Sequence, residues 1–144
     1  MKDTIYIVLI AIVCFFQPPI ICAEDQYIPE PILFVHGFAR GNKDNWSAIE
    51  KEIEQRKLLD YTKYNVKSEL YYVSDYHENL SNGSIAEIGA VVQNDLRQLS
   101  NAHNKPVKIV AHSMGGLATR YVYNEVPDLV DSVVFCGVPH LGSP

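Results

Sequence analysis

A serine at position 113 lies in a segment whose residue types suit acyl-transfer chemistry. The sequence AHSMGG occupies positions 111–116, directly after an apolar run at 107–111. A serine hydroxyl is a poor nucleophile unless it is exposed, aligned and deprotonated by a neighbouring base. A sharp strand-to-helix turn exposes the serine, and because such a turn strains the backbone, the flanking residues must be small. Ala111 and Gly115 meet that requirement, so Ser113 is the predicted nucleophile, in preference to an ordinary serine-glycine turn.

Two backbone amides are expected to accompany this serine. The tetrahedral intermediate of ester hydrolysis carries an oxyanion that is stabilised by preorganised N–H donors. One donor is the residue after the nucleophile, Met114, and the other comes from a loop after an earlier strand. Phe38 follows the apolar run at 32–35 and is placed to supply the second amide. His36, in the same segment, is expected to shape this loop by hydrogen bonding rather than to act as the base.

A third segment, GVPHLGS at 137–143, also follows an apolar run. Proline and glycine there could simply mark a loop. However, all three segments come directly after predicted strands, and ligands of parallel sheets bind beyond the carboxyl ends of the strands. We therefore expect the three segments to meet at one end of a sheet.

The elements that must position these segments alternate along the chain. Short apolar runs predict buried strands at 32–35, 70–73, 107–111 and 132–136. Amphipathic stretches predict a helix after Asp44 or Asn45, a long helix from Ser84 to about residue 101, and a helix at about 116–125. Ser84 and Glu87 have the spacing of a capping box. This alternation predicts an α/β fold with a parallel sheet and helices on both faces.

The three segments together resemble those of secreted triacylglycerol lipases of the α/β-hydrolase superfamily. The alanine-led AHSMG turn is similar to that of small bacterial lipases, and PHLGS at 139–143 points more narrowly to lipases. The resemblance runs from about residue 31 to 144. It implies the amino-terminal part of that fold, with about four strands and three helices, Ser113 as nucleophile, and Phe38 and Met114 as oxyanion donors.

Composition excludes some partners. The apolar fraction of 47% and the charged fraction of 20% are those of a folded globular protein. A net charge of −5 without a basic stripe disfavours nucleic acid. The sequence has neither a metal-ligand cluster nor a phosphate-binding loop, so no cofactor and no metal are predicted. Cys136, within an apolar run, is expected to be a buried free thiol.

The first residues are expected to be a secretory signal. Lys2 precedes an apolar run at 5–16, and Ala23 supplies a small residue before an acidic pair. A membrane anchor is the alternative, but the apolar run is shorter than the about 20 residues that span a bilayer, and prolines interrupt it. We therefore predict a signal peptide at 1–23, a partial α/β-hydrolase domain at 24–144, and a protein that is secreted or resides in the lumen of the secretory pathway.

A complete catalytic triad is not visible. In this superfamily an acid and then a histidine follow the serine. The acids after Ser113 are Glu125, Asp128 and Asp131, which lie at the end of the preceding helix and in the connection before the last predicted strand, and the only histidine is His140. A makeshift triad that uses His140 is disfavoured, because this residue belongs to the PHLGS segment. We expect the chain to be part of a longer protein that supplies both groups.

The sequence predicts a serine ester hydrolase, a lipase or carboxylesterase, whose substrate is a lipid or another ester and which contacts lipid surfaces transiently. A thioesterase or a lipid or glycolipid deacylase of the same fold would use the same turn, because acyl transfer to serine is common to all of them. A non-catalytic protein that binds lipid or a partner is the alternative from another class. The oligomeric state stays open.

Overall fold

The structure is a computed structural model that describes residues 28–37, 43–60, 62, 64, 66, 68–76 and 83–142. Phe38 and the predicted signal peptide at 1–23 lie outside the described residues. The PHLGS segment is described as far as Gly142.

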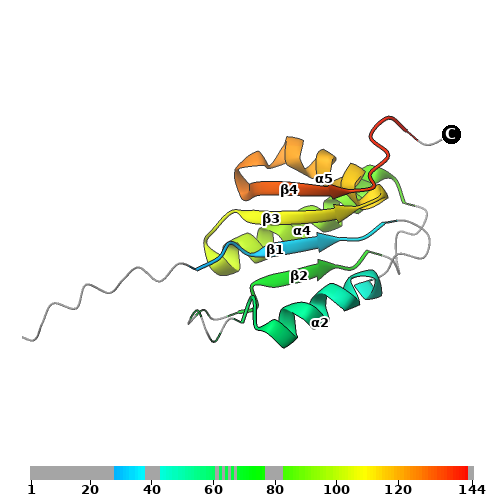
Figure 1. Cartoon of the computed structure of the whole chain (residues 1–144). Helices are drawn as coiled ribbons and strands as arrows, with labels where there is room; N and C mark the ends of the chain where they lie inside the picture. Colours follow the sequence, from blue (N-terminus) through cyan, green and yellow to red (C-terminus); the bar gives the residue numbers. More distant parts are fainter. Residues whose placement is uncertain are drawn as a thin grey trace, which may run out of the picture.

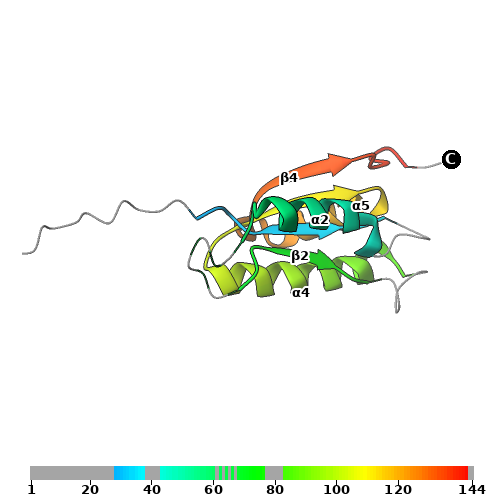
Figure 2. The same ribbon diagram turned by 60° about the horizontal axis from the view of Figure 1, so that its bottom comes forward.

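Four strands form one sheet in which every neighbouring pair is parallel. The strands are β1 (Ile32–Val35), β2 (Tyr71–Ser74), β3 (Val107–His112) and β4 (Val130–Cys136), in the spatial order β2-β1-β3-β4. Their arrowheads all lie at one end of the molecule (Figures 1 and 2). The predicted parallel α/β sheet is therefore confirmed, with strand boundaries that differ from the expected ones by two residues at most.

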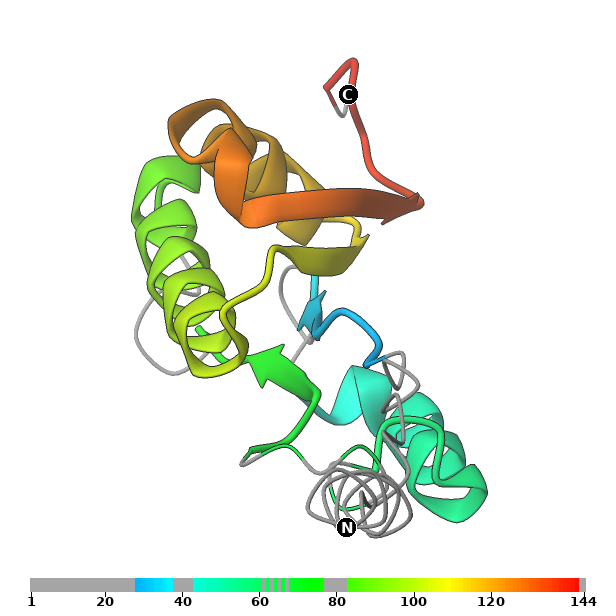
Figure 3. The ribbon, with the colours of Figure 1, turned by 90° about the vertical axis from the view of Figure 1, so that its left-hand side faces the viewer.

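Helices cover both faces of the sheet. The helical elements are η1 (Lys43–Trp46), α2 (Ser47–Arg56), α4 (Ile85–His103), α5 (Met114–Glu125) and η2 (Pro127–Leu129). Viewed along the strands, α4 and α5 lie on one side of the sheet and α2 on the other (Figure 3). The expectation of helices on both faces is confirmed.

The core accordingly has two parts, one on each face. The larger part joins α4 and α5 to the sheet through Leu33, Val35, Tyr76, Ile88, Val92, Leu96, Leu99, Val107, Ile109, Ala111, Ala118 and Val122. The smaller part lies under η1 and α2 and contains Phe34, Trp46, Ile53, Leu59 and Leu70. Because successive residues of a strand point to opposite faces, β1 contributes to both parts: Leu33 and Val35 to the first and Phe34 to the second.

The amino end of α4 has the predicted capping box. The Glu87 amide donates to the Ser84 hydroxyl oxygen at 3.2 Å, and the Ser84 amide donates to the Glu87 carboxylate at 2.7 Å. The bond from the Ser84 amide, together with one from the Ser84 hydroxyl to the same carboxylate at 3.0 Å, holds the pKa of Glu87 below its usual range. The two capping-box bonds satisfy orphan amides at the helix start, so α4 begins where the sequence places it.

The predicted cap of the helix near residue 45 is wrong. Asp44 and Asn45 lie inside the 3-10 turn η1, so neither is the residue directly before α2. The residue before α2 is Trp46, and its side chain makes no cap hydrogen bond. Trp46 and Ile53 are buried as expected, but Ile49 is 41% exposed. The 3-10 turn orients Trp46 toward the sheet, where its ring packs against Phe34.

The connections of the sheet reverse direction between β1 and β3. These strands are neighbours, but the chain leaves β1 toward α2 on one face and leaves β3 toward α5 on the other. In open α/β sheets ligands bind at such a reversal, beyond the carboxyl ends of the two strands. His36 and Ser113 directly follow these two ends.

Candidate active site

Ser113 has a backbone conformation that L-amino acids rarely adopt. It lies between β3 and α5 with φ 53° and ψ −129°. Lys57 and Asn104 are the other non-glycine residues with positive φ in the described part of the chain, and both are left-handed caps at helix ends. Ser113 has a positive φ without the left-handed ψ, and conformations of this kind persist only where the surroundings enforce them.

Hydrogen bonds hold Ser113 in that conformation from both sides. Its amide donates to the Cys136 carbonyl at the end of β4, with an N–O distance of 2.9 Å. Its carbonyl accepts from the Gly116 amide at 3.0 Å, within the first turn of α5. The serine is therefore tied to the neighbouring strand and to the following helix.

Glycines allow the three predicted segments to meet around Ser113. A Cβ at Gly115 would lie 2.1 Å from the His36 carbonyl oxygen, and a Cβ at Gly37 would lie 2.7 Å from the Ser113 Cβ. A Cβ at Gly116 would lie 2.2 Å from a Val138 methyl group. The structure thus brings residues 36–37, 113–116 and 138 together at the carboxyl ends of β1, β3 and β4.

Met114 is the first residue of α5, partly buried against the larger core. The first amides of a helix have no intrahelical acceptor and lie at the positive end of the helix dipole. The Met114 amide thus belongs to a helix end that suits developing negative charge beside Ser113. Phe38, the other predicted donor, follows Gly37 in the chain and lies outside the described residues.

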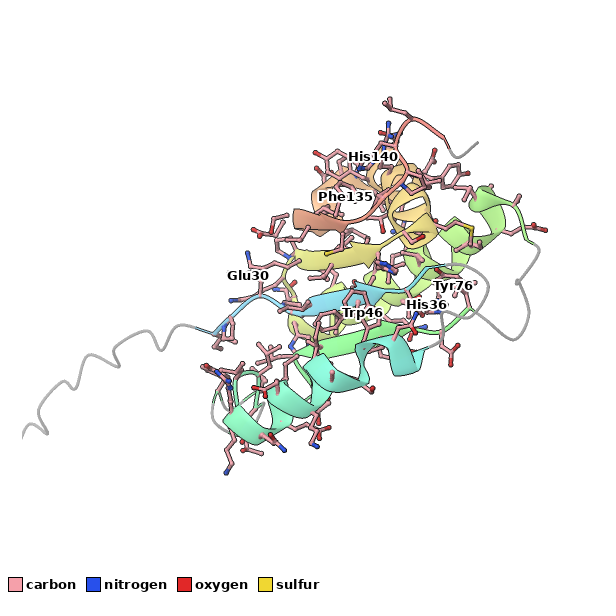
Figure 4. All side chains as sticks on the ribbon, turned by 45° about the vertical axis from the view of Figure 1, so that its right-hand side comes forward. Glu30, His36, Trp46, Tyr76, Phe135 and His140 are labelled. Atoms are coloured by element: carbon pink, nitrogen blue, oxygen red, sulfur yellow. The ribbon has the colours of Figure 1, made fainter. Side chains whose placement is uncertain are left out.

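His36 is buried, and its ring is engaged within its own loop. Its Nδ1 lies 2.9 Å from the Gly37 carbonyl oxygen, so this nitrogen is the donor. The ring stacks on Tyr76, with centroids 4.0 Å apart and planes 17° from parallel (Figure 4). The Tyr76 hydroxyl donates to the His36 carbonyl. These contacts agree with a loop-shaping histidine, and they add Tyr76, which the sequence analysis missed.

A pocket of about 380 Å³ opens beside Ser113 on the α2 face. It is lined by Asn45, Trp46, Ile49, His112 and Cys136. His112 and Cys136 are paired across β3 and β4, and Ser113 follows His112 directly. Cys136 is a free thiol, but it is only partly buried, because it lies at this pocket rather than in the core. The expectation of a fully buried thiol is therefore wrong.

A larger pocket, of about 530 Å³, lies between α5 and β4. Its lining includes Phe135 and His140, but none of residues 36–37 or 112–116. The His140 Nδ1 accepts from Arg120, 3.2 Å from the guanidinium nitrogen, and its ring meets Phe135 edge to face (Figure 4). Neither contact was predicted from the sequence.

The acids that follow Ser113 lie toward the amino end of β4. Glu125 ends α5, Asp128 lies in η2, and Asp131 is the second residue of β4. Asp131 pairs with Lys108 at the amino end of β3, and this contact holds the pKa of Asp131 below its usual range. Ser113 lies beyond the carboxyl end of β3, so these acids are at the opposite end of the sheet.

Within residues 28–37, 43–60, 62, 64, 66, 68–76 and 83–142, no group of three or more histidine, cysteine, aspartate or glutamate side chains is arranged to hold a metal ion. In the same ranges, no helix is long and apolar enough to cross a membrane.

The family model described as "PGAP1-like alpha/beta domain" matches residues 28–144. The chain belongs to this family. The PGAP1-like match covers both the described sheet and the glycine-lined turn at Ser113, and it confirms the expected α/β-hydrolase fold.

Curated relatives of this PGAP1-like chain include hydrolases of two kinds, triacylglycerol lipases and an epoxide hydrolase. It is 31% identical over 132 residues to a triacylglycerol lipase of Burkholderia plantarii, which covers 87% of this chain. It is 31% identical over 118 residues to a triacylglycerol lipase of Pseudarthrobacter phenanthrenivorans, and 27% identical over 112 residues to epoxide hydrolase 1 of Caenorhabditis elegans, each covering 78% of this chain. The matches span 34% of each lipase and 26% of the epoxide hydrolase. The distant relationship to the lipases indicates hydrolase ancestry.

Proposed function

We propose that this chain carries the nucleophile part of a serine ester hydrolase, a lipase or carboxylesterase. The observation that carries the proposal is the backbone of Ser113, which has φ 53° and ψ −129° and lies against Gly37, where a Cβ would come within 2.7 Å of the Ser113 Cβ. Ser113 is the nucleophile, and the backbone amides of Phe38 and Met114 are the oxyanion donors. Strained conformations cluster at active sites, where surrounding packing enforces them.

In the proposed reaction, the Ser113 hydroxyl oxygen attacks the carbonyl carbon of an ester while a base removes its proton. The resulting oxyanion is stabilised by the two amides and by the amino end of α5. Collapse of this intermediate expels the alcohol, which takes up the proton, and leaves an acyl group on Ser113. Water then releases the carboxylic acid by the same steps. In this superfamily the acid and the histidine of the triad follow the serine on later strands.

The proposed substrate is a lipid ester. Two relatives bear the name triacylglycerol lipase, and the pocket beside Ser113 presents Trp46 and Ile49, which suit an acyl chain. Transient contact with a lipid surface and secretion after removal of residues 1–23 belong to the same proposal. An aromatic and aliphatic lining with a few polar groups is typical of small-molecule sites.

The test is hydrolysis of p-nitrophenyl esters and a matched thioester by protein expressed from the complete coding sequence. Ser113→Ala is expected to lower kcat/KM by about 10⁴-fold or more, as removal of a nucleophile does in other serine hydrolases. Ser132→Ala is the matched control, because Ser132 is exposed toward the other end of the sheet, and it is expected to leave the rate unchanged.

Equal rates for Ser113→Ala and the wild type would contradict the proposal. A clear preference for the thioester over the ester would favour a thioesterase instead. Binding of lipid without turnover of any acyl substrate would favour a non-catalytic lipid-binding protein.

A further inference from the structure

The peptide that follows β1 is held between two elements of the fold. On one side the His36 carbonyl accepts from the Tyr76 hydroxyl. On the other side it approaches Gly115 so closely that a Cβ there would lie 2.1 Å from the carbonyl oxygen. The carbonyl thus has little freedom to move, because a hydroxyl of the β2 connection and the backbone of α5 confine it.

The Tyr76 hydroxyl is itself fixed by the packing of its ring. Tyr76 is buried in the larger core and stacks on the His36 ring at 4.0 Å (Figure 4). Burial raises its pKa above the usual range of a tyrosine, so the hydroxyl stays protonated and remains a donor. Packing of the Tyr76 ring therefore fixes the position of its hydroxyl, and the hydroxyl in turn holds the His36 carbonyl.

The confined peptide, between His36 and Gly37, lies next to Ser113. A Cβ at Gly37 would lie 3.3 Å from the Ser113 hydroxyl oxygen, and the next amide along the chain is that of Phe38. Catalytic geometry must be held within about 0.5 Å, and a displacement of about 1 Å costs on the order of 10²-fold in rate. A small rotation of this peptide would therefore displace the proposed oxyanion donor.

We propose that Tyr76 is a positioning residue for the proposed active site: its hydroxyl holds the His36 carbonyl and thereby fixes the peptide between His36 and Gly37, which lies against Ser113. The inference rests on the proposed function. Tyr76 would act on the reacting atoms only through the backbone of His36.

The test is Tyr76→Phe in protein expressed from the complete coding sequence, since this change removes the hydroxyl and keeps the ring. We expect kcat for a p-nitrophenyl ester to fall by about 10- to 100-fold with KM within about twofold, because donor alignment matters most in the transition state. The rate constant for phosphonylation of Ser113 by a fluorophosphonate should fall by a similar factor.

Tyr71→Phe is the matched control. Tyr71 is the first residue of β2, five residues before Tyr76, and its hydroxyl donates to Glu54 at 3.4 Å, on the α2 face. This variant should retain wild-type kcat and phosphonylation rate. Replacing Tyr76 with p-aminophenylalanine restores an N–H donor at the same place and should recover most of the lost rate.

The outcomes separate the inference from the proposed function. A folded wild-type protein that neither reacts with fluorophosphonate nor hydrolyses esters would remove the proposed function itself. A reactive wild type with an equally reactive Tyr76→Phe variant would overturn the inference alone. A Tyr76→Phe protein that is unfolded at the assay temperature would also overturn it, because the hydroxyl would then serve stability.

Discussion

At the scale of the residue, the site depends on a serine held in an unfavourable conformation. Ser113 has a positive φ outside the left-handed helical region, and Gly37 approaches it so closely that a Cβ there would lie 2.7 Å from the Ser113 Cβ. Such a conformation costs about 1–3 kcal/mol, which packing elsewhere must offset. The energetic cost can be measured separately from any catalysis.

Replacing Ser113 should reveal this strain. We expect Ser113→Gly to have a free energy of unfolding about 1–2 kcal/mol higher than that of Ser113→Ala, because glycine adopts positive φ without a Cβ penalty. Urea unfolding measures the difference. At Ser132, which lies in β4, the glycine variant should instead be less stable than the alanine variant, because glycine weakens an ordinary strand. A Ser113→Gly variant less stable than Ser113→Ala would contradict the strain.

The two glycines after Ser113 should differ in their tolerance of alanine. A Cβ at Gly115 meets the backbone oxygen of His36, which cannot yield without moving β1, whereas a Cβ at Gly116 meets only the side chain of Val138. We expect Gly115→Ala to lower the free energy of unfolding by about 3 kcal/mol and Gly116→Ala by about 1 kcal/mol. Urea unfolding of the two variants measures this; equal losses would show that the loop after β1 is free to shift.

At the scale of the element, α4 is joined to β2 by a buried polar contact as well as by its apolar stripe. The Ser74 hydroxyl at the end of β2 donates to the Asp95 carboxylate at 2.6 Å. Asp95 is 8% exposed, and burial raises the pKa of its carboxyl, although hydrogen bonds from Ser74 and Asn94 oppose the shift. The folded protein therefore holds a proton on Asp95 more tightly than the unfolded chain does.

This contact predicts a pH-dependent effect of Asp95→Asn. With a raised pKa in the folded state, the favourable contribution of protonated Asp95 is fully present below the ordinary value of about 3.9 and is lost as pH rises through the raised value. Asparagine does not ionise and can still accept from Ser74. The variant should therefore gain stability relative to wild type between pH 4 and pH 7, measured by urea unfolding. If Asp95→Asn were less stable than the wild type over that range, burial would not be destabilising the ionised Asp95 carboxylate.

The sequence predicts the elements well where the signal is local. Parallel strands are short apolar runs, and the start of α4 carries its own cap in Ser84 and Glu87, so neither depends on distant residues. The 3-10 turn before α2 was not predicted. It places Trp46 against Phe34, and a local sequence pattern does not reveal this contact between separate elements. Tyr76 was missed for the same reason: forty residues separate it from His36.

At the scale of the whole molecule, the sheet has an open edge at β4. Within the residues that the structure describes, β4 pairs with β3 alone, and Val134 and Phe135 are 56% and 40% exposed. Unpaired strand edges with exposed apolar side chains promote association. This edge adjoins the segment that carries His140.

A charged side chain introduced on β4 should reduce self-association of the 144-residue chain. Val134→Lys is expected to shift the chain toward monomer in light scattering at raised protein concentration, because lysine opposes strand pairing. Leu58→Lys is the control, since Leu58 is similarly exposed but lies after α2. Equal association of the wild type and Val134→Lys would show that β4 is not the associating surface.

The central claim is that Ser113 is a nucleophile, and its most direct measurement is the site of fluorophosphonate labelling. Protein expressed from the complete coding sequence is treated with the probe, digested, and examined by mass spectrometry. We predict an adduct on Ser113 that Ser132→Ala retains and Ser113→Ala loses, because only an activated serine beside oxyanion donors reacts rapidly. A folded protein labelled at a different residue, or labelled equally after Ser113→Ala, would contradict the account.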